Sequence, residues 1–426
     1  MKLLYLVLDG AADSPKDPKT SYEAADTPAL DSIAEMGVCG LMYPIEPGLA
    51  PESDSAVFSI LGYDPHKYYT GRGPIEALGV GIRIREGYEV AFRANFATVK
   101  DLTKVLIDRR VGRSLRSDEA KRLAQALDHM ELGLYDGYAR VIATVGHRAV
   151  VIIGSKTYRL SANVSNTDPA YEKRGTISVA RPRYEMKIEE CVPLDDTPEA
   201  KRTAELVNLL TERAIEILND HPVNAIRERK NLLKANALLL RDAGDSLPDV
   251  EPISERFGVS VGAIAEMPVE IGIARLLGMD VAPVPPPTPD KRSDYAIRLD
   301  ATFKLVEKHD VTYVHLKGPD EPGHDGDFEG KVRAIEAIDR YFVKPFLDRA
   351  DLETTAILVT SDHATSYTAR AHTGDPVPVV LYVPGQEPDP IKKISERECA
   401  KGALGVIGHG WELLPLALER AGLRKA

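Results

Sequence analysis

The chain has 426 residues, of which 43% are hydrophobic and 28% are charged, enough for a sizeable core and for two or three domains. Acidic residues outnumber basic ones and give a formal net charge of −11, which argues against a broad surface for nucleic acid or anionic membranes. Any anionic substrate would have to be held by local cations.

The predicted core elements begin with a strand over Leu3 to Leu8, a short apolar run that ends at Asp9, as expected for a buried parallel strand. A helix is predicted after Thr27, because this capping residue precedes a proline at the first helical position. A later helical pattern covers Lys331 to Leu347, and three apolar runs repeat the design of the first strand, at Val311–Leu316, Ala356–Thr360 and Val377–Val383. Strands that alternate with helices indicate a doubly wound, mostly parallel α/β sheet.

The middle of the chain has a different pattern of predicted elements from the two ends. It contains an arginine-rich turn at Asp108 to Arg113, a long helix candidate near Pro198 to Leu218, and strand-like pieces at 90–99, 138–145 and 149–154. We therefore expect an inserted α+β domain over 83–235 and a discontinuous core over 1–82 and 236–426. The proline-rich stretch 283–289 predicts a loop at the sheet edge.

The spacing of the cysteines and the lengths of the apolar stretches indicate in which cellular compartment the protein is located. Cys39, Cys191 and Cys399 are far apart, which disfavours a disulfide framework and a cysteine-based zinc site and suits a reducing compartment. The first apolar run is too short for a secretion signal, and no later stretch approaches the roughly 18 apolar residues of a membrane-spanning helix. We expect a cytoplasmic protein.

Acidic and histidine side chains follow one predicted strand after another. Divalent metals need several carboxylates and imidazoles that converge from different strand ends. Each residue alone could be a helix cap or a structural histidine, but the arrangement favours a metal centre. Pro322 and Gly323 predict a loop that turns two of these side chains toward one point, and His372 is expected in a loop that returns to the sheet. The candidate ligands are Asp9, Asp320, His324, Asp362, His363 and His372.

Ser53 precedes an apolar helical run that ends at Gly62. A hydroxyl at a helix N-terminus lies where backbone N–H groups and the helix dipole favour a phosphate oxygen, and metal coordination would make it a nucleophile. Capping of the helix alone is the alternative. A P-loop is not indicated, because residues 71–81 lack its lysine ending, and DGAAD at 9–13 lacks the second acid of an aspartyl-phosphate motif. These residues favour metal-dependent phosphoryl transfer.

Stretches along nearly the whole chain are similar to those of a known family. They include VLDG at 7–10, SDSAVFSILGYDP at 53–65, DEPGHDGD at 320–327, TSDHAT at 360–365 and HTGDPVPV at 372–379. Further matches are TPALDSIAEMG at 27–37, YYTGRGPIEALGVG at 68–81, FRANFAT at 92–98, ANALLLRDAG at 235–244 and IGIARLLGMD at 271–280. The chain resembles the archaeal-type cofactor-independent phosphoglycerate mutases of the alkaline phosphatase superfamily, isomerases of glycolysis and gluconeogenesis.

The resemblance implies two divalent ions, Mn²⁺ or Mg²⁺, with Zn²⁺ or Co²⁺ as alternatives, and no 2,3-bisphosphoglycerate. It implies that Ser53 is the nucleophile and passes through a phosphoserine intermediate while 3-phosphoglycerate and 2-phosphoglycerate interconvert. One ion would be held by Asp9, Ser53, Asp362 and His363, and the other by Asp320, His324 and His372.

The partner expected from the resemblance is a small phosphorylated three-carbon acid, not a nucleic acid or a membrane, and a homo-oligomer stays open. The inserted domain would close over the site and supply cations to the phosphate and carboxylate. The candidate cations carry forked guanidinium groups suited to such anions: Arg109, Arg110, Arg113, Arg148 and Arg241.

Three features depart from the family's usual pattern. Glu52 precedes the serine where glycine is usual, Ile271 stands where a lysine is usual, and 317–319 read Lys-Gly-Pro before the metal aspartate. Lys317 or another cation would have to replace the missing lysine. These changes leave open a phosphatase or phosphotransferase acting on another phosphate or phosphonate ester, and a non-catalytic metal- or metabolite-binding regulator is a third reading.

Overall fold

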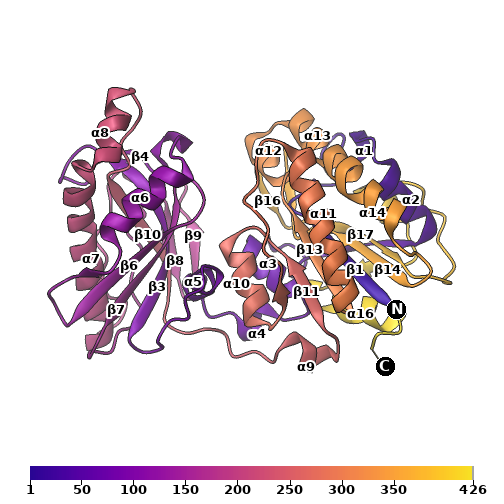
Figure 1. Cartoon of the computed structure of the whole chain (residues 1–426), viewed down its shortest axis with the longest axis horizontal. Coiled ribbons are helices and arrows are strands. Elements are labelled where there is room, and N and C mark those ends of the chain that lie inside the picture. The colour runs from indigo at the N-terminus through magenta and orange to yellow at the C-terminus, as the bar shows by residue number, and fades with distance from the viewer. Residues whose placement is uncertain (425–426) are drawn as a thin grey trace. The chain divides into compact units, whose positions relative to one another are not determined.

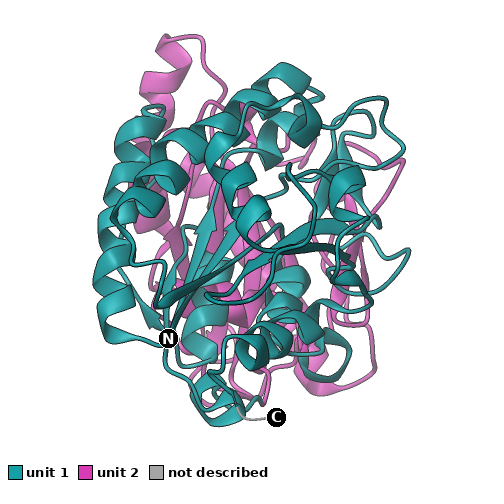
Figure 2. Cartoon of the chain, turned by 90° about the vertical axis from the view of Figure 1, so that its right-hand side faces the viewer, with its two compact units in different colours: residues 1–68, 250–426 teal, residues 69–249 magenta. Residues whose placement is uncertain are grey.

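The computed structural model describes residues 1–424 and divides the chain into two compact units. Unit 1 comprises Met1–Tyr68 and Val250–Ala426, and unit 2 comprises Tyr69–Asp249 (Figure 2). These boundaries differ from the expected 82/83 and 235/236. The reason is that two flanking elements, a helix at 73–79 and a strand at 237–244, pack against the sheet of unit 2.

Unit 1 is built on one eight-stranded sheet, in which five of the neighbouring pairs are parallel and two are antiparallel (Figure 1). The doubly wound, mostly parallel core is thus confirmed. One strand at 377–382 runs antiparallel to both neighbours, which corrects the expectation that it repeats the design of the first strand. In spatial order the strands are β12 (Asp280–Val281), β11 (Val261–Ile264), β13 (Val311–Leu316), β1 (Lys2–Leu8), β14 (Thr355–Thr360), β17 (Val377–Tyr382), β2 (Val38–Met42) and β18 (Gly405–Ile407).

Helices cover both faces of this sheet. On one face Tyr5 of β1 donates to the carbonyl of Ile60 at 2.8 Å, and on the other Gly262 of β11 lies against Leu305. The helices in the N-terminal segment of unit 1, before residue 69, are α1 (Ser21–Ala24), α2 (Pro28–Met36), α3 (Ser53–Ile60) and α4 (Pro65–Tyr68). Those after residue 250 are α9 (Ile253–Phe257), α10 (Pro268–Leu276), α11 (Lys291–Lys308), α12 (Asp320–Asp325), α13 (Phe328–Ile338), η2 (Asp339–Val343), α14 (Lys344–Arg349), α15 (Glu396–Cys399), η3 (Gly410–Glu412) and α16 (Leu413–Arg420).

Two further predicted segments of unit 1 can be compared with the structure. The helical stretch over 331–347 is divided into α13, the π-helical turn η2 and α14. The expected loop at 283–289 follows the edge strand β12, as predicted. A separate hairpin of β15 (Ala364–Ser366) and β16 (Ala371–Thr373) lies beyond the end of β14.

Unit 2 is an antiparallel sheet with helices, which confirms the α+β character expected of the insertion. Helices α6 and α7 cover one face, where Phe92, Phe96, Leu123 and Leu210 belong to one buried cluster. The strands are β3 (Glu89–Val99), β4 (Leu106–Asp108), β5 (Met130–Glu131), β6 (Gly137–Ala143), β7 (Arg148–Ser155) and β10 (Ala237–Gly244), with a separate hairpin of β8 (Tyr171–Arg174) and β9 (Ile177–Ala180). The helices are α5 (Gly73–Gly79), η1 (Val111–Arg113), α6 (Ser117–Leu127), α7 (Pro198–Asn219) and α8 (Pro222–Arg229).

The opposite face of this sheet carries α5, and Gly73 makes that packing close. A Cβ atom at Gly73 would lie 2.0 Å from the carbonyl oxygen of Ala91 and 2.9 Å from that of Asp242. Only glycine lets the start of α5 approach β3 and β10 this closely. Among residues 1–424, no helix is both long and apolar enough to cross a membrane.

We expect Gly73→Ala to lower the free energy of unfolding by about 2 kcal/mol or more, because backbone atoms must move to admit the methyl group. Urea unfolding followed by circular dichroism measures this loss. Gly408→Ala is the matched control, since a Cβ there meets no atom of the described residues within 4 Å. Equal stability of the two variants would contradict the packing argument.

Candidate metal centre

Parallel pairing brings three acidic side chains to one edge of the sheet in unit 1. Leu8 of β1 is in register with Leu316 of β13, and Val7 is in register with Thr360 of β14. The residues that follow these three strands therefore lie side by side. They include Asp9, Asp320 and Asp362.

A first group is formed by Asp9, Asp362 and His363, which are buried and have ligand atoms within 4.8 Å of one another. The Nε2 atom of His363 lies 3.3 Å from Oδ2 of Asp362 and 3.7 Å from Oδ1 of Asp9. These three atoms are buried and have no hydrogen-bond partner among the described residues. Buried polar atoms without partners are costly, and a divalent ion bound by all three would remove that cost.

A second group is formed by Asp320, His324 and His372. Asp320 and His324 are one turn apart on the short helix α12, not in the predicted loop, because the chain closes a helical turn directly after β13. His372 lies on β16, which pairs with β15, and not in a loop. Both imidazole Nε2 atoms lie 3.4 Å from Oδ1 of Asp320, so one ion could contact all three side chains.

The imidazoles of the second group are oriented through their other nitrogens. Nδ1 of His372 donates to the carbonyl of Pro51 at 2.7 Å, and Nδ1 of His324 faces the carbonyl of Arg370 at 3.4 Å. In neutral rings with this tautomer both Nε2 atoms carry lone pairs, yet they lie 3.1 Å apart. Two lone pairs at this distance repel unless a proton or a metal ion lies beside them, so the donor set fits a metal ion that replaces the proton.

Gly10 allows the two groups to lie close together. Its φ is +57°, and a Cβ there would lie 2.6 Å from Oδ1 of Asp320 and 2.7 Å from Oγ1 of Thr365. Its backbone N–H donates to Oδ1 of Asp362 at 2.9 Å. The Asp-Gly pair after β1 therefore supplies a ligand and the space that its neighbours need.

Ser53 is the first residue of α3 and is half-buried. Glu52, which is exposed, occupies the N-cap position, so the capping alternative does not describe Ser53. The carbonyl of Pro51 accepts the hydrogen bond from His372, which ties the segment before α3 to the second group.

Three charged or polar groups lie beside the first group; Lys317 was named from the sequence, whereas His315 and Glu270 were missed. The Nε2 atom of His315 lies 3.4 Å from Oδ2 of Asp362, and Nζ of Lys317 lies 3.2 Å from Oδ2 of Asp9. Lys317 also forms an ion pair with Glu270 of α10. The available signal was the alternation of Tyr313, His315 and Lys317 along an otherwise apolar strand, which places them on one face.

Burial and mutual charge shift the ionisation of these groups. Burial raises the pKa of Asp9 to about 7, with Lys317 opposing the shift, and burial lowers the pKa of His363 to about 4. For His372, burial disfavours the charged form, but Asp320 outweighs it and raises the pKa to about 9. For Asp362 burial is outweighed by His363, His315 and Lys317, which hold its pKa well below the usual range.

The candidate arginines lie in unit 2 and differ in their partners. Arg109 is held by a forked ion pair with Asp168, at 2.9 and 2.7 Å, and Arg241 stacks on Tyr171 with 3.7 Å between its guanidinium carbon and the ring centre. Burial lowers the pKa of His147 to about 3, and the positive charges of four nearby arginines act in the same direction: Arg148, Arg110, Arg113 and Arg93.

The sequence missed Arg93, which lies directly opposite Arg241 in the pairing of β3 with β10. Burial, together with Arg241 and Arg72, lowers the pKa of Arg93 to about 9. Since Asn95 is two residues from Arg93 and opposite Arg148, the arginines of β3, β7 and β10 share one face of the sheet.

The turn that carries two of the arginines is strained. Val111, Gly112 and Arg113 have φ values of 56°, 58° and 55°, and a β-branched residue rarely adopts this conformation. Val111 is fully buried, so its packing helps to hold the turn. Strain of this kind is commonly found at binding sites.

The comparisons with known proteins agree with the resemblance seen in the sequence. A family model described as 2,3-bisphosphoglycerate-independent phosphoglycerate mutase matches residues 34–224. The mutase of that name from Aeropyrum pernix is 50% identical over 424 residues, covering 98% of this chain and 99% of the relative. The chain belongs to the 2,3-bisphosphoglycerate-independent phosphoglycerate mutase family. This confirms the predicted family.

Other relatives extend the similarity. The protein named 2,3-bisphosphoglycerate-independent phosphoglycerate mutase 1 of Archaeoglobus fulgidus is 42% identical, over 100% of this chain and 99% of its own. The solved cofactor-independent phosphoglycerate mutase of Thermoplasma acidophilum has a TM-score of 0.62 and 32% identity, over 99% of this chain and 100% of that chain. A solved structure of a Pyrococcus horikoshii protein has a TM-score of 0.77 and 28% identity, over 100% of this chain and 98% of that chain.

We expect metal binding at pH 7 to release protons and the affinity for Mn²⁺ to rise from pH 6 to about pH 9. An ion needs the unprotonated ligands, whereas in the metal-free chain His372 keeps its proton up to a pKa of about 9 and Asp9 up to about 7. Calorimetric titration in two buffers of different ionisation enthalpy counts the protons released.

His372→Gln should remove most of this proton release, whereas the exposed His66→Gln should behave as the unmodified chain. An Mn²⁺ affinity that is constant between pH 6 and pH 9 would contradict the assignment of these ligands.

Proposed function

We propose that this chain interconverts 3-phosphoglycerate and 2-phosphoglycerate in the cytoplasm, without 2,3-bisphosphoglycerate, and thereby serves glycolysis and gluconeogenesis. The observation that carries the proposal is the pair of acid–imidazole groups beside the start of α3, in a chain 50% identical to a protein named as such a mutase. An isomerase of this class moves a phosphoryl group within one substrate.

The proposed ions are Mn²⁺ or Mg²⁺, with Zn²⁺ or Co²⁺ as alternatives. One would be held by Asp9, Ser53, Asp362 and His363, and the other by Asp320, His324 and His372. When bound, the ions polarise phosphoryl oxygens and lower the pKa of a coordinated hydroxyl.

Ser53 acts as the nucleophile in the proposed reaction. Its hydroxyl gives up its proton and forms a bond to phosphorus while the bond from phosphorus to the glycerate oxygen breaks, and the glycerate oxygen takes up a proton. The glycerate then reorients, its other hydroxyl loses its proton and attacks the phosphoserine, and the oxygen of Ser53 leaves phosphorus and regains a proton. Donors from the backbone at the start of α3 favour the negative charge of the transferred group.

Lys317 is the proposed replacement for the lysine that the family usually carries at the position of Ile271. Its ammonium group pairs with Glu270, the residue before Ile271, and lies 3.2 Å from Asp9. A cation at this position offsets the charge of a phosphoryl group next to the carboxylates. The loss of one lysine would thus be balanced by another directly after β13.

The arginine face of unit 2 is proposed to bind the phosphate and carboxylate of the substrate. Arg110, Arg113, Arg148 and Arg241 are the candidates from the sequence, and Arg93 joins them. Arg109, already paired with Asp168, would rather hold the segments that carry the others. Concentrated like charges on one face are costly by themselves, and a substrate with two anionic groups, a phosphate and a carboxylate, would offset this cost.

We expect Ser53→Ala to abolish isomer formation, with at least about a 1,000-fold loss of kcat, because no other hydroxyl would take the phosphoryl group. An enolase-coupled assay with Mn²⁺ measures the rate, and mass spectrometry after brief exposure to substrate detects phosphoserine in the unmodified chain.

Ser55→Ala is the matched control, because the hydroxyl of Ser55 bonds to the carbonyl of Glu52 and is on the same helix. If free phosphate were released faster than the isomer forms, the phosphatase alternative would replace the mutase assignment.

We expect Arg148→Ala to raise the KM for 3-phosphoglycerate roughly 10-fold to 100-fold, since a hydrogen-bonded charge contributes about 1.5–3 kcal/mol. The affinity for Mn²⁺ should stay unchanged. Arg116→Ala is the control, because Arg116 is exposed and pairs with Asp118 on the surface of unit 2. A KM that does not change would remove Arg148 from the substrate site.

A further inference from the structure

Thr365 lies between the two ligand groups although it belongs to neither. Its side chain is fully buried on β15, and its Oγ1 donates to Oδ1 of Asp320 at 2.7 Å. The same oxygen lies 3.0 Å from Nδ1 of His363. Thr365 therefore touches one ligand of each group.

The hydrogens of this contact can be assigned from valence. A hydroxyl has one hydrogen, and because that hydrogen is directed to the carboxylate of Asp320, the oxygen accepts from Nδ1–H of His363. Nε2 of His363 is then left with its lone pair and faces Asp9 and Asp362. One hydroxyl thus sets the tautomer and ring orientation of a ligand in the first group and the carboxylate orientation of a ligand in the second.

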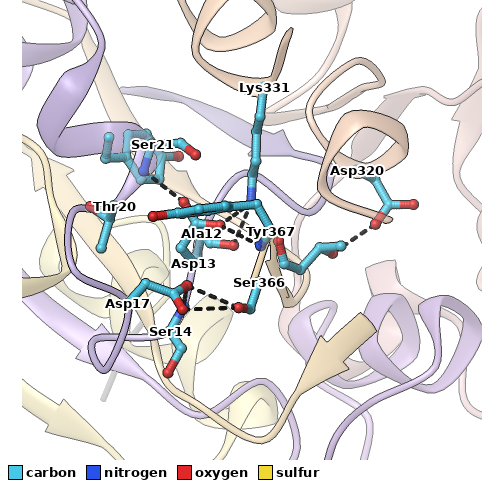
Figure 3. A network of polar contacts seen from close by, with 12 residues as sticks. Ala12, Asp13, Ser14, Asp17, Thr20, Ser21, Asp320, Lys331, Ser366 and Tyr367 are labelled. Atoms are coloured by element: carbon cyan, nitrogen blue, oxygen red, sulfur yellow. Dashed lines mark hydrogen bonds and ion pairs between the residues drawn. The ribbon is translucent and has the colours of Figure 1, made fainter. Parts of the chain in front are cut away.

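The backbone of Thr365 is held on both sides. Its N–H donates to the carbonyl of Ala12 at 2.9 Å, and its carbonyl accepts from Nζ of Lys331 at 2.7 Å. Lys331 is fully buried and also donates to Ala12 at 2.9 Å and to Asp13 at 2.8 Å. Figure 3 shows Lys331 reaching down to Ala12 and Asp13, with Asp320 to one side.

Asp13 is itself fixed, because its carboxylate accepts from the backbone N–H of Ser21 at 2.6 Å. The loop after β1, the start of α1, α13 and β15 thus meet at one buried ammonium group. A side chain supported in this way is rigid, and a rigid neighbour preorganises the ligands that it contacts.

We propose that Thr365 is a positioning residue whose single hydroxyl sets the metal affinity of both ligand groups at once. This inference rests on the proposed function, which places an ion in each group. It assigns to Thr365 no contact with substrate or ion.

The test is Thr365→Val, which removes the hydroxyl and keeps the shape. Titration with Mn²⁺, followed by calorimetry and by the electron paramagnetic resonance of the free ion, gives the two dissociation constants. We expect both to rise roughly 10-fold to 100-fold, the usual effect of losing a partner of a metal ligand. Thr365→Ser, which keeps the hydroxyl, should restore both constants to within a few-fold of the unmodified chain.

Thr312→Val is the matched control, because Thr312 is a fully buried strand residue of the same unit whose hydroxyl has no hydrogen-bond partner among residues 1–424. It should leave both constants unchanged. Urea unfolding of the metal-free variants separates a general loss of stability from a loss of metal affinity.

Unchanged constants in Thr365→Val, or a change in only one of them, would overturn the inference while leaving the proposed function in place. The same loss in Thr312→Val would also overturn it, since the effect would then come from core packing. If the unmodified chain bound fewer than two ions, the metal assignment of the proposed function would fall, and this inference with it.

Discussion

Repulsion among three carboxylates is the constraint on which the rest of unit 1 depends. The parallel pairing of β13, β1 and β14 brings Asp9, Asp320 and Asp362 to one edge of the sheet, where the burial of Asp9 and Asp362 limits the screening by water. Lys317 and the imidazoles lie where they offset part of this charge. Cations therefore stabilise this edge of the sheet, and an ion bound as proposed would link metal binding to folding.

In unit 2 the clustered charges are positive. Arg93 and Arg241 face each other across two paired strands, and three more arginines surround His147. Glu76 lies beside Arg93 and Asp242 lies beside Arg241, where they offset part of this charge. The concentration of arginines on one sheet face, next to a strained turn at 111–113, supports the proposal that this face binds an anion.

Several local features could be predicted from the sequence. The strands β1, β13 and β14 were found within a residue or two, because a continuous apolar run followed by polar residues is a local property. The antiparallel direction of β17 could not be found, because an apolar run has the same composition in either direction. Thr365 and Glu270 were missed because nothing in an isolated threonine or glutamate marks the partner that it will meet.

The candidate Asp and His residues, and the places of Asp9 and Asp362 just after strands, could be predicted from the sequence alone, since each prediction depends on neighbouring residues. Their division into two groups came from the resemblance to a family and not from spacing. Only the tertiary structure decided that α12 and β16 bring Asp320, His324 and His372 together and that Lys317 faces Asp9. The physical reason is that strand register and helix packing join residues up to hundreds of positions apart, and no local pattern encodes such pairings.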